Sequence, residues 1–322
     1  MIIALDAMGG DFAPEVNIDG AIDSFQDNDD IRVVLVGDEE RIAKGLKEKN
    51  APTDRISVCH APDVVSMDES PSYALRKRKE SSIAIAVDLV RDGKADAVVS
   101  AGHSGVAMAM CLIKLGKAKG VNRPAIATIM PSLKDPFVLL DAGANVDCEP
   151  NNLLEFAMMG SAYSSALFNK KEPKVALMNI GEEETKGNEL TKETFKLLRK
   201  SHVNFVGNIE GKDMFRGRAD VVVCDGFAGN ITLKISEGLS EAIFRMLKRE
   251  VGRSVLGRIG YLFMRPALKS FKRQTDYAEY GGAPLLGING TCIISHGRSS
   301  AKAIKNAISV ANTVSMKRVY ET

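Results

Sequence analysis

Short runs of β-branched and aliphatic residues recur along the chain, each followed by a polar or glycine-rich loop and then by a segment with helical periodicity. Most runs are continuously apolar rather than alternating, which favours central strands that are covered on both faces. The pattern predicts an α/β fold with a largely parallel sheet and helices outside it. The predicted strands are Ile2–Leu5, Arg32–Val36, Ala97–Val99, Ala125–Ile129, Val138–Leu140, Val175–Leu177 and Val221–Val223.

Helix signals lie between these strands. Ser70-Pro71 has the residues of an N-cap and first helical position, and Pro150–Phe168 and Ser299–Val319 carry apolar residues at helical spacing. No tandem repeat or long Pro/Gly/Ser-rich linker divides the 322 residues. We therefore expect residues 1–322 to form one α/β catalytic domain.

The loops after four strands carry the functional signal. They are Asp6–Asp11, Ser100–Gly105, Asn179–Asn188 and Asp225–Asn230. In open α/β sheets the ligand cleft lies beyond the carboxyl ends of the strands, so we expect these loops to share one sheet edge. Glycines let the backbone approach an anion, and helix N-termini favour negative charge, which makes phosphate the natural ligand. Tight strand-to-helix turns would explain any single loop.

Two side chains in these loops suit the acylation of phosphate. Lys186 can hold phosphate as a mobile point charge, and Asn230 can donate to a polarised carbonyl. The alternatives are a solvated lysine beside Glu182–Glu184 and a helix N-cap at Asn230. The candidate phosphate or substrate contacts are Asp6, Gly9, Gly10, Asp11, Ser100, Gly102, His103, Ser104, Gly105, Gly181, Asn188, Asp225, Gly226, Gly229, His296 and Gly297.

Several function classes are disfavoured. The chain has no G-x-G-x-x-G, no complete P-loop and no G-x-S-x-G, so we expect neither a nucleotide cofactor nor a serine nucleophile. Five scattered cysteines and four histidines lack metal-ligand spacing, so we predict reduced structural thiols and no metal. A net charge of +2 gives no nucleic-acid signal.

A segment of bulky apolar residues punctuated by arginines, Val255–Arg265, is too short to cross a bilayer as a helix. We expect it near the tip of a protruding helical hairpin over 236–273, with Pro266 separating two helices. Such a tip suits peripheral contact with an anionic membrane, docking of an acidic carrier protein, or burial against a second copy. The candidate contact residues are Arg253, Arg258, Leu262, Phe263, Arg265 and Lys269.

The short apolar start of the chain lacks the basic flank and cleavage region of a signal peptide. No uncharged apolar stretch approaches the roughly 20 residues of a spanning helix. We therefore expect a cytoplasmic protein that associates with the inner face of the membrane.

Six motifs, in order along essentially the whole chain, resemble the phosphate acyltransferase (PlsX) family. They are Asp6–Asp11, Asp141–Asp147, Lys186–Leu190, Asp225–Asn230, Tyr280–Ala283 and His296-Gly297. The resemblance implies transfer of a fatty acyl group from acyl-[acyl carrier protein] to inorganic phosphate, which forms acyl-phosphate for phospholipid synthesis. It also implies a homodimer, a three-layer α/β/α fold like that of isocitrate/isopropylmalate dehydrogenase, and Lys186 and Asn230 as catalytic residues.

The sequence departs from the family pattern at a few positions. His103-Ser104 stands where relatives often carry Asn-Thr, Ala228 where Thr is common, and Asn289 where Lys often appears. Two other functions stay open at this point: a phosphotransacetylase-like enzyme that uses acyl-CoA, and a non-catalytic membrane-associated scaffold for lipid synthesis.

Overall fold

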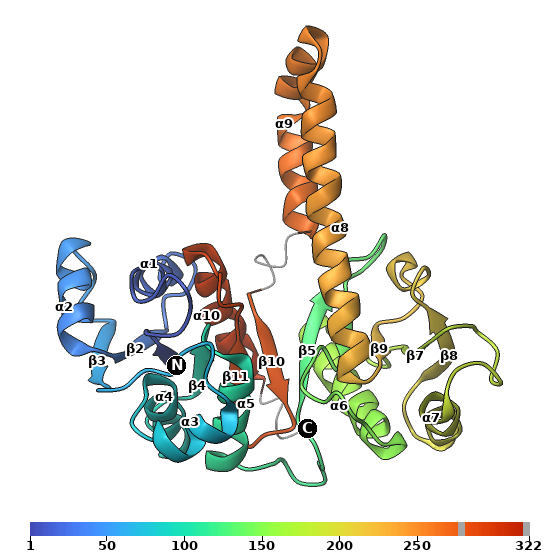
Figure 1. The fold of residues 1–322 in the computed structure, drawn as a ribbon, viewed down its shortest axis with the longest axis horizontal. Helices are drawn as coiled ribbons and strands as arrows, with labels where there is room; N and C mark the ends of the chain where they lie inside the picture. Colours follow the sequence, from blue (N-terminus) through green and yellow to red (C-terminus); the bar gives the residue numbers. More distant parts are fainter. Residues whose placement is uncertain (276–280, 318–322) are drawn as a thin grey trace.

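The computed structural model describes residues 1–275 and 281–317, and an eleven-stranded sheet runs through that part of the chain (Figure 1). Its order is β3-β2-β1-β4-β11-β10-β5-β6-β9-β7-β8. The strands are β1 (Ile2–Asp6), β2 (Arg32–Gly37), β3 (Ile56–His60), β4 (Ala97–Ser100), β5 (Ala125–Met130), β6 (Phe137–Leu140), β7 (Val175–Asn179), β8 (Phe205–Glu210), β9 (Val221–Val223), β10 (Ala283–Leu286) and β11 (Thr291–Ile294).

Every predicted strand is present, but β3, β8, β10 and β11 were not predicted. β10 lies in the middle of the sheet although it contains Pro284, which has no N–H to donate and normally argues against a central strand. The predicted strands are apolar runs, whereas polar residues interrupt the missed strands β3 and β8, and a proline lies in β10.

The sheet consists of two parallel blocks joined by antiparallel strands. In the first block β3, β2, β1, β4 and β11 are parallel, and in the second block β6, β9, β7 and β8 are parallel. Between them β10 is antiparallel to β11 and β5, and β5 is antiparallel to β6. The second block therefore runs opposite to the first. The prediction of one shared sheet edge for all the glycine-rich loops is wrong, because the two blocks direct their carboxyl ends to opposite ends of the sheet.

Helices cover both faces. They are α1 (Glu15–Ser24), α2 (Glu39–Glu48), α3 (Pro71–Lys77), α4 (Ser82–Arg91), α5 (Ser104–Lys114), α6 (Pro150–Phe168), α7 (Glu189–Lys200), α8 (Gly226–Gly252), α9 (Val255–Thr275) and α10 (Ala301–Met316), with a 3₁₀ turn η1 at Met214–Arg216. The predicted helix Pro150–Phe168 is confirmed, as is the cap at Ser70, whose hydroxyl accepts from the N–H of Tyr73. The last helix begins after Ser300, and the end of its predicted range lies outside the described residues.

Four apolar clusters fill the space between the sheet and the helices. On the first block α1, α2 and α10 pack against one face, and α3, α4 and α5 against the other. On the second block α6 and α7 cover one face together with the end of α10, and the base of α8 covers the other with η1. The structure is therefore a mixed α/β fold with a large central sheet between helices.

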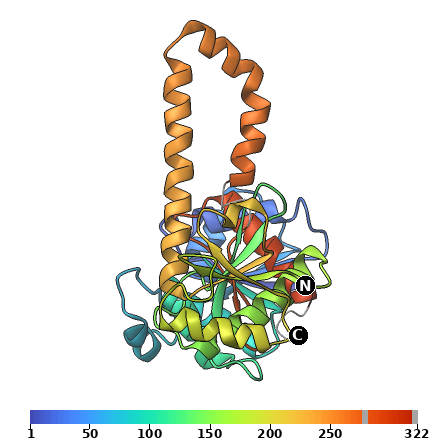
Figure 2. The ribbon, with the colours of Figure 1, turned by 90° about the vertical axis from the view of Figure 1, so that its right-hand side faces the viewer.

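Helices α8 and α9 form a long hairpin that projects from the sheet (Figures 1 and 2). It extends from Gly226 to Thr275, beyond the predicted 236–273. Pro266 lies inside α9, so the prediction that it separates two helices is wrong. Figure 2 shows that α9 is bent, which is how a helix accommodates the missing N–H of an internal proline. In the described part of the chain, no helix is long and apolar enough to span a bilayer.

Close packing of α1 on α10 gives a test of the fold. A Cβ atom on Gly20 would lie 2.5 Å from Cβ of Ile304, whereas nothing lies within 4 Å of the corresponding position on Gly260. We expect Gly20→Ala to lower the free energy of unfolding by about 1–3 kcal/mol through overpacking. Gly260→Ala should be neutral or raise it by up to about 1 kcal/mol, because alanine favours helix. Urea unfolding measures both, and a Gly20→Ala protein as stable as the parent would contradict the packing.

Candidate active site

The carboxylate of Asp141, at the end of β6, organises the loops of the second block. Asp141 is fully buried. Its Oδ1 accepts from the N–H groups of Ile126, Gly143 and Ala144 at 3.0–3.1 Å. Its Oδ2 accepts from the backbone N–H and the side-chain Nδ2 of Asn145 at 2.7 and 2.9 Å. This one side chain therefore satisfies donors from β5 and from the loop that follows β6.

The loop held by Asp141 positions Asn230. Gly226 N–H donates to the carbonyl of Asn145 at 2.7 Å, which fixes the start of α8. A Cβ on Gly229 would lie 1.9 Å from the carbonyl oxygen of Asp141, so only glycine allows this approach. Gly143, at φ +136°, faces the side chain of Asn230, where a Cβ would lie 3.3 Å from Cβ of Asn230. Asn230 thus stands exposed beside a glycine-lined turn.

Asn230 does not cap a helix. The N-cap of α8 is Asp225, whose Oδ1 accepts from the N–H of Ala228 at 2.8 Å. Asn230 lies inside the helix, so the N-cap alternative is wrong. Its carboxamide makes no hydrogen bond with any described residue and is available to a ligand.

Lys186 lies in the loop after β7, the strand that pairs with β9. Nδ2 of Asn179 donates to the carbonyl of Lys186 at 3.1 Å, and Nδ2 of Asn208 donates to that of Glu183 at 3.1 Å. Gly187 adopts φ +94°, and a Cβ there would lie 2.1 Å from Oγ1 of Thr191. These contacts fix the path of the loop.

The ammonium of Lys186 is exposed and forms no ion pair within the described residues. Two of the neighbouring glutamates form ion pairs with arginines: Glu182 with Arg218, and Glu184 with Arg199. The alternative of a solvated loop lysine fits this exposure as well as a ligand-binding lysine does, and it stays open. The remaining predicted residues of this loop have structural contacts: Oδ1 of Asn188 caps α7 by accepting from Thr191 N–H at 2.9 Å, and Gly181 adjoins the stem of Lys186.

A second cluster lies at the carboxyl ends of β1, β4 and β11. Asp6 is 2% exposed, and its Oδ2 accepts from the hydroxyl of Ser100 at 2.7 Å, while the Ser100 hydroxyl accepts from Gly102 N–H at 3.1 Å. Oδ1 of Asp6 has no hydrogen-bond partner among the described residues. Burial raises the pKa of Asp6, against the opposing effect of the neighbouring hydroxyls of Ser82 and Ser100.

Close backbone approach joins the other members of this cluster. Asp11 N–H donates to the carbonyl of Gly297 at 2.8 Å, and a Cβ on Gly10, at φ +104°, would lie 3.1 Å from that carbonyl. Nδ1 of His103 faces Val106 N–H at 3.4 Å, which makes His103 the N-cap of α5. Ser104 and Gly105 form the first turn of that helix, and His296 adjoins Gly297.

The structure therefore assigns the predicted residues to two clusters. The first-block cluster contains Asp6, Gly9, Gly10, Asp11, Ser100, Gly102, His103, Ser104, Gly105, His296 and Gly297. The second-block cluster contains Gly181, Lys186, Asn188, Asp225, Gly226, Gly229 and Asn230. Lys186 and Asn230 are thus brought to the ends of neighbouring strands, apart from the Asp6 and Ser100 loops.

A cavity of about 940 Å³ lies between α8 and α9 of the hairpin and reaches the turn after β11 of the first block. Its lining includes Lys234 from α8, Arg265 and Lys269 from α9, and His296 and Arg298 from the turn after β11. Two of the predicted carrier contacts, Arg265 and Lys269, are therefore close to the first-block cluster. The other hairpin residues lie outward: Arg253 pairs with Glu250, Nε of Arg258 donates to the carbonyl of Gly252, and Leu262 and Phe263 are 66% and 82% exposed.

The residues that shape the clusters were largely missed. The sequence places Asp141 in a family motif and Asn179 at the start of a polar loop but gives neither a role, and it singles out neither Asn17 nor Asn208. Nδ2 of the buried Asn17 donates to the carbonyls of Ala7 and Gly9 at 2.9 Å and so fixes the loop after β1. These asparagines lie in α1, β7 and β8, and the sequence gives no signal of such a role because only the fold shows which carbonyls they reach.

The departures from the family pattern have different surroundings. Ala228 donates its N–H to Asp225 in the first turn of α8. Asn289 lies in the turn between β10 and β11, away from both clusters, where its Nδ2 donates to the carbonyl of Lys117 at 2.9 Å.

Two cysteines lie near Asn230 but are poorly suited to nucleophilic catalysis. Burial raises the pKa of Cys148 to about 11 and that of Cys224 well above its ordinary value. All five cysteines are free, and three of them are buried. Among the described residues, no three His, Cys, Asp or Glu side chains gather as metal ligands would.

Comparison with known proteins identifies the relatives of this chain. The model of a family described as "Fatty acid synthesis protein" matches residues 1–322. A phosphate acyltransferase from Thermodesulfovibrio yellowstonii is 62% identical over 318 residues, which cover 99% of this chain and 92% of the relative. A phosphate acyltransferase from Pelotomaculum thermopropionicum is 52% identical over 321 residues, covering 100% and 93%.

Solved structures share the fold at much lower identity. A phosphotransacetylase from Streptococcus pyogenes is 17% identical with a TM-score of 0.65, and the match covers 100% of this chain and 94% of that protein. A 4-hydroxythreonine-4-phosphate dehydrogenase from Klebsiella pneumoniae is 13% identical with a TM-score of 0.57, covering 98% and 99%. Phosphotransacetylases and dehydrogenases of this kind are therefore neighbours in fold.

The buried carboxyl of Asp6 predicts a pH-dependent effect on stability. Its pKa is raised in the folded protein from an ordinary value of 3.8, so its contribution to folding is fully present below that pH and is lost as pH rises through the folded-state pKa. We expect Asp6→Asn to gain stability relative to the parent as pH increases from about 4 to 8. Urea unfolding at several pH values measures the difference. The exposed Asp29→Asn serves as the control, and a difference for Asp6→Asn that does not vary with pH would show that the carboxyl is not destabilised by burial.

Proposed function

The chain belongs to the phosphate acyltransferase family, and on that premise we propose that it transfers a fatty acyl group from acyl-[acyl carrier protein] to inorganic phosphate. The product, acyl-phosphate, would supply phospholipid synthesis. The observation that carries the proposal is that Lys186 and Asn230 follow neighbouring strands. No described residue forms an ion pair with the ammonium of Lys186 or a hydrogen bond with the carboxamide of Asn230. A cation and a neutral donor are what phosphate and a thioester carbonyl require.

The proposed reaction is direct acyl transfer without a covalent enzyme intermediate. A phosphate oxygen attacks the thioester carbonyl and forms a new C–O bond. The resulting tetrahedral intermediate collapses with cleavage of the C–S bond, and the thiolate of the carrier leaves and takes up a proton from the solvent. Lys186 orients phosphate, while Asn230 donates to the developing oxyanion, a contribution of about 3 kcal/mol for one such donor.

The first-block cluster takes a share of substrate binding in this proposal. The N–H groups at the start of α5 and the glycine-rich turn after β1 suit an anionic group. An acyl-CoA-dependent reaction of the phosphotransacetylase kind would use the same groups, so the identity of the thioester donor is tested separately. A non-catalytic scaffold would leave Lys186 and Asn230 without a role.

We further propose that the protein is a homodimer. Exposed apolar side chains recur at every fourth position along α8, at Phe227, Ile231, Ile235, Leu239 and Ile243, each between 43% and 62% exposed. An i, i+4 ridge of this kind packs into the groove of another helix. A second copy of the hairpin provides such a helix, and its approach would remove an apolar surface that is costly to leave in water.

The cavity and the tip of the hairpin suit two further contacts. Arg265 and Lys269 line the cavity beside His296 and would steer an acidic carrier protein toward the first block. Leu262 and Phe263 are exposed together with Leu256 and Met264, as expected for side chains that enter a membrane interface. Arg253 and Arg258 would meet anionic headgroups, at about 1 kcal/mol for each charge. Peripheral attachment to the inner face of the membrane follows from this proposal.

The finer fold assignment is also part of the proposal. We assign residues 1–322 to a single α/β catalytic domain of the isocitrate/isopropylmalate dehydrogenase type, with the hairpin as an insertion within it. Support comes from one sheet shared by both blocks and from fold neighbours that include dehydrogenases.

One assay tests the reaction and its two central residues. The pure protein should form acyl-phosphate, trapped with hydroxylamine, from labelled phosphate and acyl-[acyl carrier protein], and should do so less efficiently from acyl-CoA. Lys186→Ala and Asn230→Ala should each lower turnover at least about tenfold with an unchanged melting temperature, because both side chains serve the substrates. Lys192→Ala, an exposed lysine on α7, is the control. Unchanged turnover in the two site variants would overturn their assignment.

Vesicle binding tests the hairpin tip. Replacement of both Leu262 and Phe263 by Asp should abolish sedimentation with anionic vesicles, because two charges oppose entry into the interface. Activity on soluble substrates and the size of the particle in solution are the controls. If the variant pellets with vesicles as the parent does, another surface makes the contact.

A further inference from the structure

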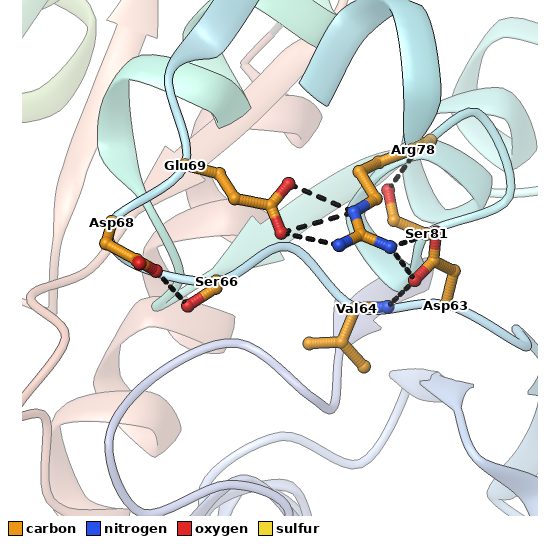
Figure 3. Close-up of polar contacts among 7 residues, drawn as sticks. All are labelled: Asp63, Val64, Ser66, Asp68, Glu69, Arg78 and Ser81. Carbon is orange, nitrogen blue, oxygen red and sulfur yellow. Dashed lines mark hydrogen bonds and ion pairs between the residues drawn. The ribbon is translucent and has the colours of Figure 1, made fainter. Parts of the chain in front are cut away.

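The guanidinium of Arg78, just after α3, is shared between two carboxylates (Figure 3). Nε and Nη2 donate to Glu69 at 2.8–3.2 Å, and Nη1 donates to both oxygens of Asp63 at 2.9 and 3.2 Å. The hydrogen bonds from Arg78 hold the pKa of Glu69 below its ordinary value. A planar guanidinium that donates from two of its edges fixes the positions of both carboxylates, which a single exposed ion pair does not.

These contacts close a loop at both of its ends. Asp63 and Glu69 bound the central part, residues 63–69, of the segment that leads from β3 to α3. The base of the segment is further tied by Ser82 N–H, which donates to the carbonyl of Asp63 at 3.0 Å, and by the hydroxyl of Ser81, which donates to that of Arg78 at 2.7 Å. We name residues 63–69 the Arg78 loop.

The Arg78 loop has little internal structure of its own. Within it the described backbone makes one backbone–backbone hydrogen bond, from Glu69 N–H to the carbonyl of Ser66 at 3.2 Å, and Val64 N–H donates to Oδ1 of Asp63 at 3.0 Å. Val64 and Met67 are 38% and 49% exposed. Val65 packs against the apolar core of the first block, and the two ends of the loop are held by the guanidinium of Arg78.

This loop forms a wall of the first-block cluster. Val64 and Val65 line a small cavity together with Asp6, Ser100 and His103. At the other end of the loop Met67 reaches the turn after β11, where a Cβ on Gly297 would lie 3.2 Å from Cε of Met67. The Arg78 loop thus contacts the cluster from two sides, although Arg78 itself does not line it.

We infer that Arg78 is a positioning residue for the transfer reaction: its guanidinium, shared between Asp63 and Glu69, holds the Arg78 loop against the first-block cluster. The inference rests on the proposed function, because it takes that cluster as part of the substrate site. If the loop is ordered before the substrate binds, binding loses no conformational entropy of the loop. If the loop is loosened, the substrate must order it, and this lowers the affinity. Arg78 therefore acts on substrate affinity more than on the chemical step.

The test compares two arginines with similar contacts in different places. Arg78→Ala should raise KM for phosphate or for the acyl donor about tenfold and leave kcat within about threefold. Arg78→Lys should recover part of the loss, because it keeps the charge but not the fork. Arg91→Ala is the matched control: Arg91 also bridges two carboxylates, Asp88 and Asp92, at the far end of α4. It should leave both parameters unchanged.

Hydrogen exchange provides a readout that does not depend on activity. Amides of the Arg78 loop should exchange at least about tenfold faster in Arg78→Ala than in the parent and in Arg91→Ala. If Arg78→Ala proves too unstable to purify, Arg78→Lys and Glu69→Gln carry the test with the same expectations at smaller amplitude.

The outcomes separate the inference from the proposed function. A parent that makes no acyl-phosphate refutes the proposed function, while the exchange rates still report on the loop. With an active parent, KM values and loop exchange equal to those of the parent in the Arg78 variants overturn the inference. A fall in kcat alone, at unchanged KM, also overturns it, because it would show an effect on chemistry or on the folded fraction instead of on loop order.

Discussion

The buried carboxylate of Asp141 is the interaction on which the second half of the molecule depends. It accepts five hydrogen bonds from β5 and from the loop after β6, and without it those part-buried donors would lose their partner. The same loop receives the first N–H of α8 and allows Gly229 to approach the backbone. One carboxylate therefore sets the position of Asn230 and the root of the helix that becomes the hairpin.

Because the strand direction reverses at the centre of the sheet, the candidate functional groups form two clusters, and the clusters differ in chemistry. The first-block cluster offers backbone donors and hydroxyls around a buried carboxyl whose pKa is raised. The second-block cluster offers an unpaired ammonium and a carboxamide. In the proposed reaction Lys186 orients phosphate and charge develops on the carbonyl oxygen next to Asn230, while the first-block donors take a separate share of substrate binding.

The hairpin carries the surfaces through which the protein would contact other molecules. Its ridge on α8 is apolar, the cavity at its base is rich in lysine and arginine, and its tip again carries exposed apolar side chains. Each surface suits a different contact: a second copy, an acidic carrier and a lipid interface. The proposed product makes the arrangement coherent, since a long-chain acyl-phosphate is more soluble in the bilayer than in water.

By itself the sequence determined the apolar strands, the long helix Pro150–Phe168, the polar loops after the strands and the two side chains suited to phosphate acylation. These features follow from local sequence pattern, because buried strands need continuous apolar runs and helices need apolar residues at a regular spacing. Only the tertiary structure decided that β10 and β5 reverse the sheet and that Asp225 rather than Asn230 caps α8. It also decided that Asp141 ties β5 to the loop after β6, and that Arg78 holds residues 63–69. These contacts do not follow the helix or strand period, so the sequence pattern does not predict them. Donor and acceptor can be paired only when the folded backbone is known.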